Sequence, residues 1–409
     1  MWSPSSHWLP ATATPDAAVL LASRGVRAFA DGYVSVLLPV YLLGLGFDGL
    51  QIGAVATATL IGSAALTLLV GFIAHRFRAR PLLSGAALLM AATGAGFTVV
   101  HGFWPLLVVA FVGTLNPSSG DVSVFLPLEQ SVLSRTVSAK ERTALFARYS
   151  VVGSLVAAVG ALSSGLPDLL ATQGVFPFSL ALQAMFVLYG VLGLTALALY
   201  RRLSPALEEE HQVPAPLRES RRIVYTLAGL FALDSLGGGF VVQSLVALWL
   251  FERFGLSVAT AGTIFFWTGV MSAASYLVAV PLARRIGLVN TMVFTHLPSN
   301  VLLLLTPLMP TLPLAILLLL ARSALSQMDV PTRNSYVMAV VPPAERPAAA
   351  SVTTVPRTLA QAAPPLLSGY LLGLSSFGWP LVIAGALKGS YDLLLLGLFS
   401  KVHPPEEAD

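Results

Sequence analysis

Long hydrophobic stretches alternate with short polar connections along the whole chain. Most stretches are about 20 residues or longer, which is the length that a helix needs to cross a bilayer and far more than a barrel strand needs. A bilayer offers no water to unpaired backbone groups, so stretches of this kind must be helices. Twelve spans are predicted, near residues 18–45, 50–74, 82–100, 104–133, 143–166, 176–200, 223–250, 256–281, 288–307, 312–341, 348–374 and 379–400. The pattern therefore predicts an all-α membrane protein.

The composition agrees with a protein whose main partner is the lipid bilayer. Hydrophobic residues make up 56% of the chain and charged residues 10%, whereas a soluble domain carries about 25% charged residues. The chain has no cysteine, and its six histidines are scattered without the spacing of a metal site. We expect neither a metal nor another cofactor, no nucleic-acid partner and a monomer.

Basic residues outside the spans concentrate on one side of the predicted membrane. If the N-terminus is cytoplasmic, the outer loops hold only Arg253, and all other basic loop residues lie inside. The positive-inside rule then places both termini in the cytoplasm, which requires an even number of spans. Residues 1–17 show no basic segment of a signal peptide, so we expect a tail there, in a protein of the bacterial inner membrane.

The chain reads as two related halves. A segment beginning at Leu126 is repeated from Val330 with a constant offset of 204 residues, which separates Pro127 from Pro331 and Arg142 from Arg346. We expect six-helix bundles at 18–200 and 223–400, joined by a polar linker at 201–222 and followed by a tail at 401–409. Parallel repeats of six spans are a transporter architecture. Within the repeat, Glu129 stands opposite Arg333.

Two loop motifs add a family resemblance. The first reads Gly71-Phe-Ile-Ala-His75-Arg76-Phe-Arg78-Ala-Arg80, and the second reads Pro342-Pro-Ala-Glu345-Arg346, with a partial copy that ends at Arg142. Over essentially its whole length the chain resembles the major facilitator superfamily, whose first motif has Asp at the position of His75 and Gly at that of Arg78. The resemblance implies twelve helices in two pseudo-symmetric bundles, and a gating role for Gly71, Arg76, Arg80, Arg142 and Arg346.

Charged residues inside the spans are the candidates for a functional site, because an ionisable group at membrane depth is costly and usually faces the bundle interior. The basic ones are Arg24, Arg27, Arg148, Arg322, Arg333, Arg357 and Lys388, and the acidic ones are Asp31, Asp121, Glu129, Asp234, Asp329 and Asp392. The resemblance implies that spans one, four, seven and ten line the pathway.

Spans one and four carry the first group of candidates. Arg24, Arg27 and Asp31 share one face of a helix. Either this face lines the pathway, or Arg27 and Asp31 form an internal pair that neutralises itself. In span four, Pro117 and Gly120 bend the helix near Asp121, Glu129 and Gln130. The two carboxylates are the leading proton-coupling candidates, and the alternative is a structural pair of Glu129 with Arg148.

Spans seven to twelve carry the second group. Asp234 precedes a triple glycine that predicts a hinge, so binding and gating are both open for it. Arg322, Asp329 and Arg333 form one stripe on span ten. Arg357 lies on span eleven. On span twelve, Lys388 and Asp392 are four residues apart, and we expect a structural pair.

We therefore expect a secondary transporter of a small organic solute that works by alternating access. No phosphate-binding loop occurs, and carboxylates near mid-membrane favour coupling to protons. Export is favoured, uptake of an organic anion or zwitterion is the alternative, a non-transporting receptor is a distant one, and an enzyme is not expected. The proposed proton sites are Asp31, Asp121, Glu129, Asp234 and Asp329. The proposed solute contacts are Arg27, Gln130, Gln243, Arg322, Arg333, Asn334 and Arg357.

Overall fold

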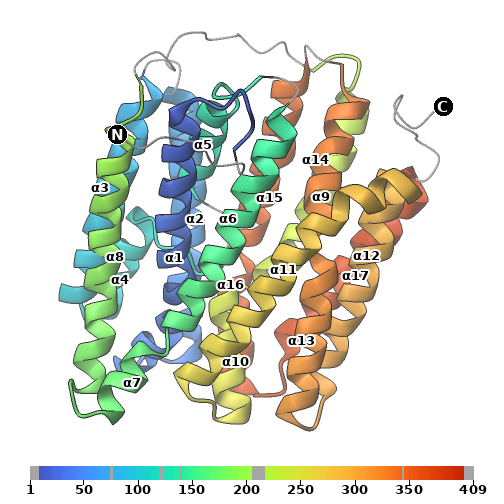
Figure 1. Cartoon of the computed structure of the whole chain (residues 1–409). Coiled ribbons are helices and arrows are strands. Elements are labelled where there is room, and N and C mark those ends of the chain that lie inside the picture. The colour runs from blue at the N-terminus through green and yellow to red at the C-terminus, as the bar shows by residue number, and fades with distance from the viewer. Residues whose placement is uncertain are drawn as a thin grey trace. The chain divides into compact units, whose positions relative to one another are not determined.

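A computed structural model describes residues 9–73, 77–118, 123–138, 141–204, 217–342 and 345–399. The regular elements in these segments are helices, and no strand occurs among them (Figure 1). In the first half they are α1 (Pro15–Gly44), α2 (Gly49–Ile73), α3 (Ala79–Val99), α4 (Phe103–Val112), α5 (Phe125–Leu133), α6 (Arg142–Ser163), α7 (Leu166–Thr172) and α8 (Phe178–Tyr200). In the second half they are α9 (Arg221–Phe240), α10 (Gln243–Phe254), α11 (Val258–Ile286), α12 (Leu288–Leu305), η3 (Thr306–Leu308), α13 (Leu312–Ser326), α14 (Asp329–Val340), α15 (Arg346–Ala362), α16 (Pro364–Leu374) and α17 (Trp379–Phe399).

The helices group into two compact units. The first combines Met1–Leu45, Gly62–His211 and Ser257–Phe266, and the second combines Gly46–Ile61, Gln212–Leu256 and Trp267–Asp409. The helices α2 and α11 each contribute residues to both units.

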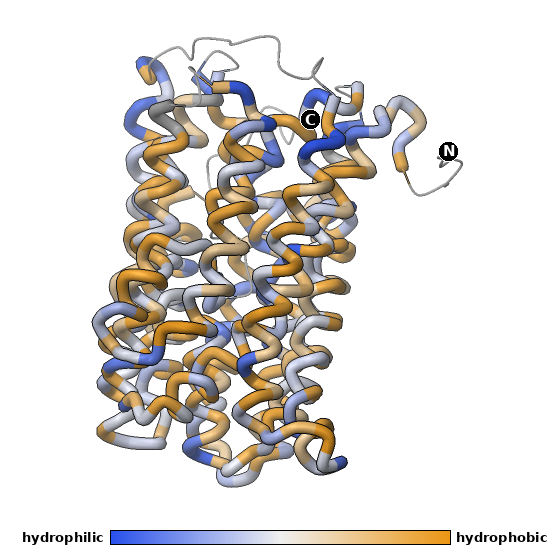
Figure 2. Tube along the Cα trace, turned by 90° about the vertical axis from the view of Figure 1, so that its left-hand side faces the viewer, coloured by the Kyte–Doolittle hydropathy of each residue, from blue (hydrophilic) through white to orange (hydrophobic). Residues whose placement is uncertain are grey.

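Ten helical segments of the described chain are long and apolar enough to cross a membrane. Hydrophobic positions dominate the lengths of the helices in Figure 2, and hydrophilic positions gather mostly at their ends. The all-helical membrane architecture that the sequence predicts is thereby confirmed.

Several spans that were expected to be continuous are instead two helices in sequence. Span four is divided into α4 and α5, span seven into α9 and α10, span ten into α13 and α14, and span eleven into α15 and α16. Proline explains the last break, because Pro364 has no N–H to continue the ladder of α15. The hinge expected at Gly237–Gly239 is displaced, since α9 continues through the glycines and ends at Phe240.

Glycines allow close packing of α1 against α6 in the first unit. A Cβ atom on Gly32 would lie 2.1 Å from the carbonyl oxygen of Ala157, and one on Gly160 would lie 2.1 Å from that of Phe29. Small residues at such crossings let two membrane helices approach to backbone contact. The close crossing anchors the helix that carries Arg27.

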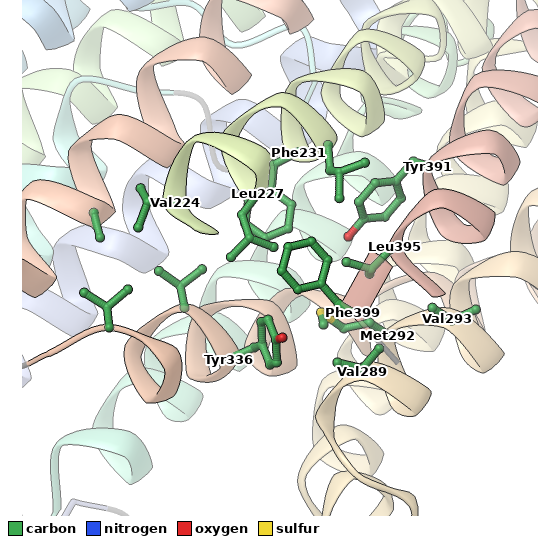
Figure 3. Packing of buried hydrophobic residues seen from close by; sticks show 14 residues of the cluster. Val224, Leu227, Phe231, Val289, Met292, Val293, Tyr336, Tyr391, Leu395 and Phe399 are labelled. Atoms are coloured by element: carbon green, nitrogen blue, oxygen red, sulfur yellow. The ribbon is translucent and has the colours of Figure 1, made fainter. Parts of the chain in front are cut away.

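An apolar cluster holds four helices of the second unit together. In Figure 3, Phe231 from α9, Met292 from α12, Tyr336 from α14 and Tyr391 from α17 converge. These four side chains are at most 1% exposed. Because Tyr391 is the chain neighbour of Asp392, this packing also fixes the helices that carry the charged residues of the unit.

Candidate functional site

In the first unit, a buried ion pair joins α1 to α5. Arg27 is 1% exposed and Glu129 is fully buried. The Nη2 atom of Arg27 donates to Oε2 of Glu129, and its Nε atom donates to the Tyr200 hydroxyl at 3.0 Å. The Tyr200 hydroxyl donates to Oε1 of Glu129 at 2.6 Å, and the Tyr149 hydroxyl donates to Oε2. The ring of Phe125 lies 4.2 Å from the Arg27 guanidinium carbon. The carboxylate therefore has a complete set of donors.

The pairings considered from the sequence do not match this geometry. The partner of Glu129 is Arg27 on another helix, and neither the Glu129–Arg148 pair nor a closed Arg27–Asp31 pair forms. Asp31 is buried on α1, within Coulomb range of Arg27 and Arg24. In the described segments, no side chain donates a hydrogen bond to it. Gln130 points to a partly exposed face of α5.

In the second unit, Asp234 on α9 is the centre of a larger network. Its Oδ1 accepts a hydrogen bond from Lys388 Nζ at 2.6 Å, and its Oδ2 accepts one from Arg333 Nη1 at 3.1 Å. Arg333 also lies 3.4 Å from Asp329, one helical turn earlier on α14. The predicted Lys388–Asp392 pair is therefore wrong. The lysine instead crosses to α9, where Gly237 leaves room: a Cβ there would lie 2.8 Å from its Cγ.

A histidine that the sequence interpretation dismissed extends this network. His296 on α12 is 3% exposed, and its Nδ1 lies 2.9 Å from Oδ1 of Asp392 on α17. Its Nε2 lies 3.8 Å from Oδ1 of Asp234. The Nδ2 atom of Asn300 donates to Oδ2 of Asp392 at 2.8 Å. The spacing of His296 and Asn300, four residues apart in an apolar run, is the signal that could have revealed them.

The two networks have the same arrangement with the charges exchanged. In the first unit a base on span one binds an acid on span four, and in the second an acid on span seven binds a base on span ten. The offset of 204 residues brings Glu129 onto Arg333. The reversal in the repeated segment therefore marks two equivalent buried pairs, one in each unit.

Two other arginines, on the spans of the second unit, have no acidic contact among the described residues. Arg357 on α15 donates to the Ser235 hydroxyl at 3.3 Å. The Nε atom of Arg322 on α13 is buried without a hydrogen-bond partner. No carboxylate of the described residues lies within 4.0 Å of either guanidinium. Asn334 is exposed on α14, and Gln243 begins α10.

The repeated loop motif anchors the start of the first span in each half. Glu141 accepts hydrogen bonds from the backbone N–H and hydroxyl of Thr12. Glu345 accepts backbone bonds from Arg218 and Glu219 at 3.0 Å, and both a backbone and a hydroxyl bond from Ser220. The Thr12 and Ser220 hydrogen bonds lower the pKa of the two carboxyl groups. Both glutamates thus hold the segment just before the first helix of their half.

The expected gating residues are mostly engaged with backbone. Arg142 donates to the carbonyl of Ser134 at 2.9 Å, and Arg346 donates to that of Val341 at 3.3 Å. Arg80 donates to the carbonyl of Arg201. Gly71 lies in α2. Arg76 and Asp121 lie outside the described residues. Within those residues, no group of side chains has the arrangement of a metal site.

Comparison with known proteins agrees with this architecture. The family model of the Major Facilitator Superfamily matches residues 20–243. An uncharacterized membrane protein of Saccharomyces cerevisiae, YJR124C, is 26% identical over 95% of this chain and 94% of its own length.

Solved transporters share the fold. A bacterial homolog of the human lysosomal transporter Spinster superposes with a TM-score of 0.72, at 15% identity, over 94% of this chain and 97% of that one. The nucleoside transporter NupG gives 0.67, at 15% identity, over 94% and 99%. The human organic anion transporter MFSD10 (TETRAN) gives 0.63, at 18% identity, over 93% and 100%. The chain belongs to the Major Facilitator Superfamily.

Proposed function

We propose that this protein is a secondary transporter that moves a small organic anion across the membrane by alternating access, coupled to protons. Its family consists of transporters of small solutes, and one structural relative is described as an organic anion transporter. The observation that supports an anionic solute is that Arg322 and Arg357, on the spans of the second unit, have no carboxylate contact among the described residues.

The argument is one of charge balance at membrane depth. A charged side chain there is costly, and the cost falls only when an opposite charge lies near. Arg333 and Lys388 meet this requirement through Asp234. Arg322 and Arg357 are partly exposed and have no such contact, although both feel the field of Asp234. A bound anion would supply the missing negative charge, and guanidinium groups bind carboxylates and phosphates with two parallel hydrogen bonds.

The same balance disfavours a cationic drug as the solute. A cation would have to approach two uncompensated guanidinium groups, whereas the acidic residues of both networks already face bases. The buried carboxylates supply titratable groups, which supports a proton gradient as the energy source. The direction of net movement is read from the assay below. Export is the direction first expected from the sequence, and proton-coupled uptake of an organic anion is the alternative.

The test uses solutes that differ in charge and little else. The purified protein is screened by thermal shift against matched sets of small sulfonates, neutral sulfonamides and quaternary ammonium ions, because a ligand of the native state raises the melting temperature. Binders are then followed in proteoliposomes, with uptake and release measured separately. Sulfonates should stabilise and cross, and equal effects from the ammonium ions would overturn the proposal.

Arg322→Gln and Arg357→Gln test the residues. Losing one charge-assisted contact costs about 1.5–3 kcal/mol, which is roughly a 10- to 150-fold rise in the Kd of a sulfonate. Arg285→Gln is the matched control, because Arg285 is exposed in the last turn of α11. If all three variants bind sulfonate like the wild type, these arginines do not hold the solute.

A further inference from the structure

His296 lies between two carboxylates that come from different helices. Its Nδ1 is 2.9 Å from Asp392, and its Nε2 is 3.8 Å from Asp234. A neutral imidazole has one N–H and one lone pair, so one of these carboxylates must face a lone pair. An imidazolium presents N–H to both. The Asn300 amide nitrogen lies 3.0 Å from the same Nδ1 and can donate to it when this nitrogen carries no proton. The site therefore has a partner for each state of the ring, with the two carboxylates favouring the doubly protonated one.

The charged groups around His296 leave one place for a proton. Asp234, Asp329 and Asp392 carry three negative charges, and Arg333 and Lys388 carry two positive ones. All five are buried, with exposed fractions between 0% and 8%. An unpaired charge buried among them is costly, and a proton on His296 removes the imbalance. His296 and the Lys388 ammonium both lie near Oδ1 of Asp234, at 3.8 Å and 2.6 Å. A protonated His296 therefore competes with Lys388 for this oxygen.

We propose that the His296–Asp392 pair is the proton-binding site of this transporter and that the proton moves in the same direction as the anion; this inference rests on the proposed function. The coupling arises from Arg322 and Arg357, the two cations within the spans of the unit that have no carboxylate contact among the described residues. While they are unoccupied, their field opposes a further positive charge in the unit. An anion bound to them cancels that field, so it strengthens proton binding, and by linkage the proton strengthens anion binding to the same degree.

Charged and titratable groups from several helices surround His296. The carboxylates that act on its charge are Asp234 from α9, Asp329 from α14 and Asp392 from α17, and Tyr391 from α17 packs against the ring. The cations that act through Asp234 are Lys388 from α17, Arg333 from α14, Arg322 from α13 and Arg357 from α15. His296 is the group of this set whose ordinary titration falls near neutral pH. The remaining members set how tightly it holds its proton.

A solute-free experiment tests the proton site. The protein is labelled with ¹⁵N-histidine in lipid nanodiscs, and its imidazole signals are followed from about pH 5 to about pH 9. The signal missing from His296→Gln should change from doubly to singly protonated within this range. Asp392→Asn should move the change to lower pH, and it serves as the assigning variant if His296→Gln does not fold. A His296 signal that stays in one state throughout would overturn the inference.

The second experiment tests coupling, with benzenesulfonate or the strongest-binding sulfonate of the screen as the probe. Adding it to the wild type should raise the pH at which His296 loses its proton. In proteoliposomes, His296→Gln should keep sulfonate exchange at equal pH but lose the acceleration by a pH gradient. His101→Gln is the matched control, because His101 is exposed at a helix end.

The two possible failures are distinguishable. If the variant's transport still responds to the gradient as the wild type's does, the proton site is wrong while the anion proposal stands. If no sulfonate binds or crosses, the proposed function is wrong, and the nanodisc titration alone decides whether His296 binds a proton.

Discussion

Replacing Glu129 by glutamine should destabilise the protein strongly, although the two side chains have almost the same size. Glu129 is fully buried and accepts hydrogen bonds from Arg27, Tyr149 and Tyr200. After the change, the Arg27 guanidinium, which is 1% exposed, has no carboxylate in contact. The Tyr200 hydroxyl and the Phe125 ring remain against it, and Asp31 remains within Coulomb range. Removing one member of a buried ion pair costs about 3–5 kcal/mol of unfolding free energy.

A double-mutant cycle separates the interaction energy between Arg27 and Glu129 from the effects that each substitution has on its other neighbours. In Arg27→Gln/Glu129→Gln neither charge is left alone, so the double variant should lose about 2 kcal/mol less than the sum of the single variants. The unfolding free energy is measured by titrating the protein in detergent micelles with sodium dodecyl sulfate. Glu219→Gln makes the same change at an exposed position and should fall within about 0.5 kcal/mol of the wild type.

The reasoning fails if Glu129→Gln unfolds within about 1 kcal/mol of the wild type, or if the two single variants simply add. Either result would mean that Arg27 finds another partner or reaches water without much cost. A stable Glu129→Gln variant would also permit the direct test of proton coupling at this position, which its closed set of donors disfavours.

Two further predictions follow from contacts described above. The pKa of Glu345 lies below its usual value of 4.5, so its contribution to stability is fully present above that pH and is lost as the pH falls through the lowered pKa. Glu345→Gln should therefore melt at a lower temperature than the wild type near neutral pH and lose less on acidification, and parallel melting curves would contradict this. Gly369→Ala in α16 should lower the free energy of unfolding by about 1–3 kcal/mol, because the new Cβ would lie 2.1 Å from the carbonyl oxygen of Gly49. The control is Gly373→Ala on the same helix, whose Cβ meets nothing within 4 Å. In the same micelle titration it should be neutral or slightly stabilising.

The sequence was sufficient for the helices and the family, because both depend on signals within one segment. A span of apolar residues is helical wherever it lies in the bundle. The breaks inside spans could not be read in the same way. Pro39, Pro281 and Pro298 lie within continuous helices, whereas the break between α9 and α10 contains no proline. Neighbouring helices decide which of these positions actually interrupts the ladder.

The partners of the buried charges were the main failure of prediction from sequence. Spacing on one helix correctly places Asp329 beside Arg333, but the same reasoning wrongly pairs Lys388 with Asp392. A pair four residues apart on one helix is worth only about 0.3–0.5 kcal/mol, so a better partner on another helix easily displaces it. Lys388 and Asp234 are separated by 154 residues. Only the packing of α9 against α17 brings them together.

Glu141 and Glu345 each bind a residue that is far away in the sequence, which has a consequence for synthesis on the ribosome. Glu141 captures Thr12 across 129 residues, and Glu345 captures Ser220 across 125 residues. In each half, the entrance of the first span therefore stays untied until the fourth span has been made. A nascent chain that stalls before Glu345 would leave the amide groups of Arg218, Glu219 and Ser220, just before α9, without this acceptor.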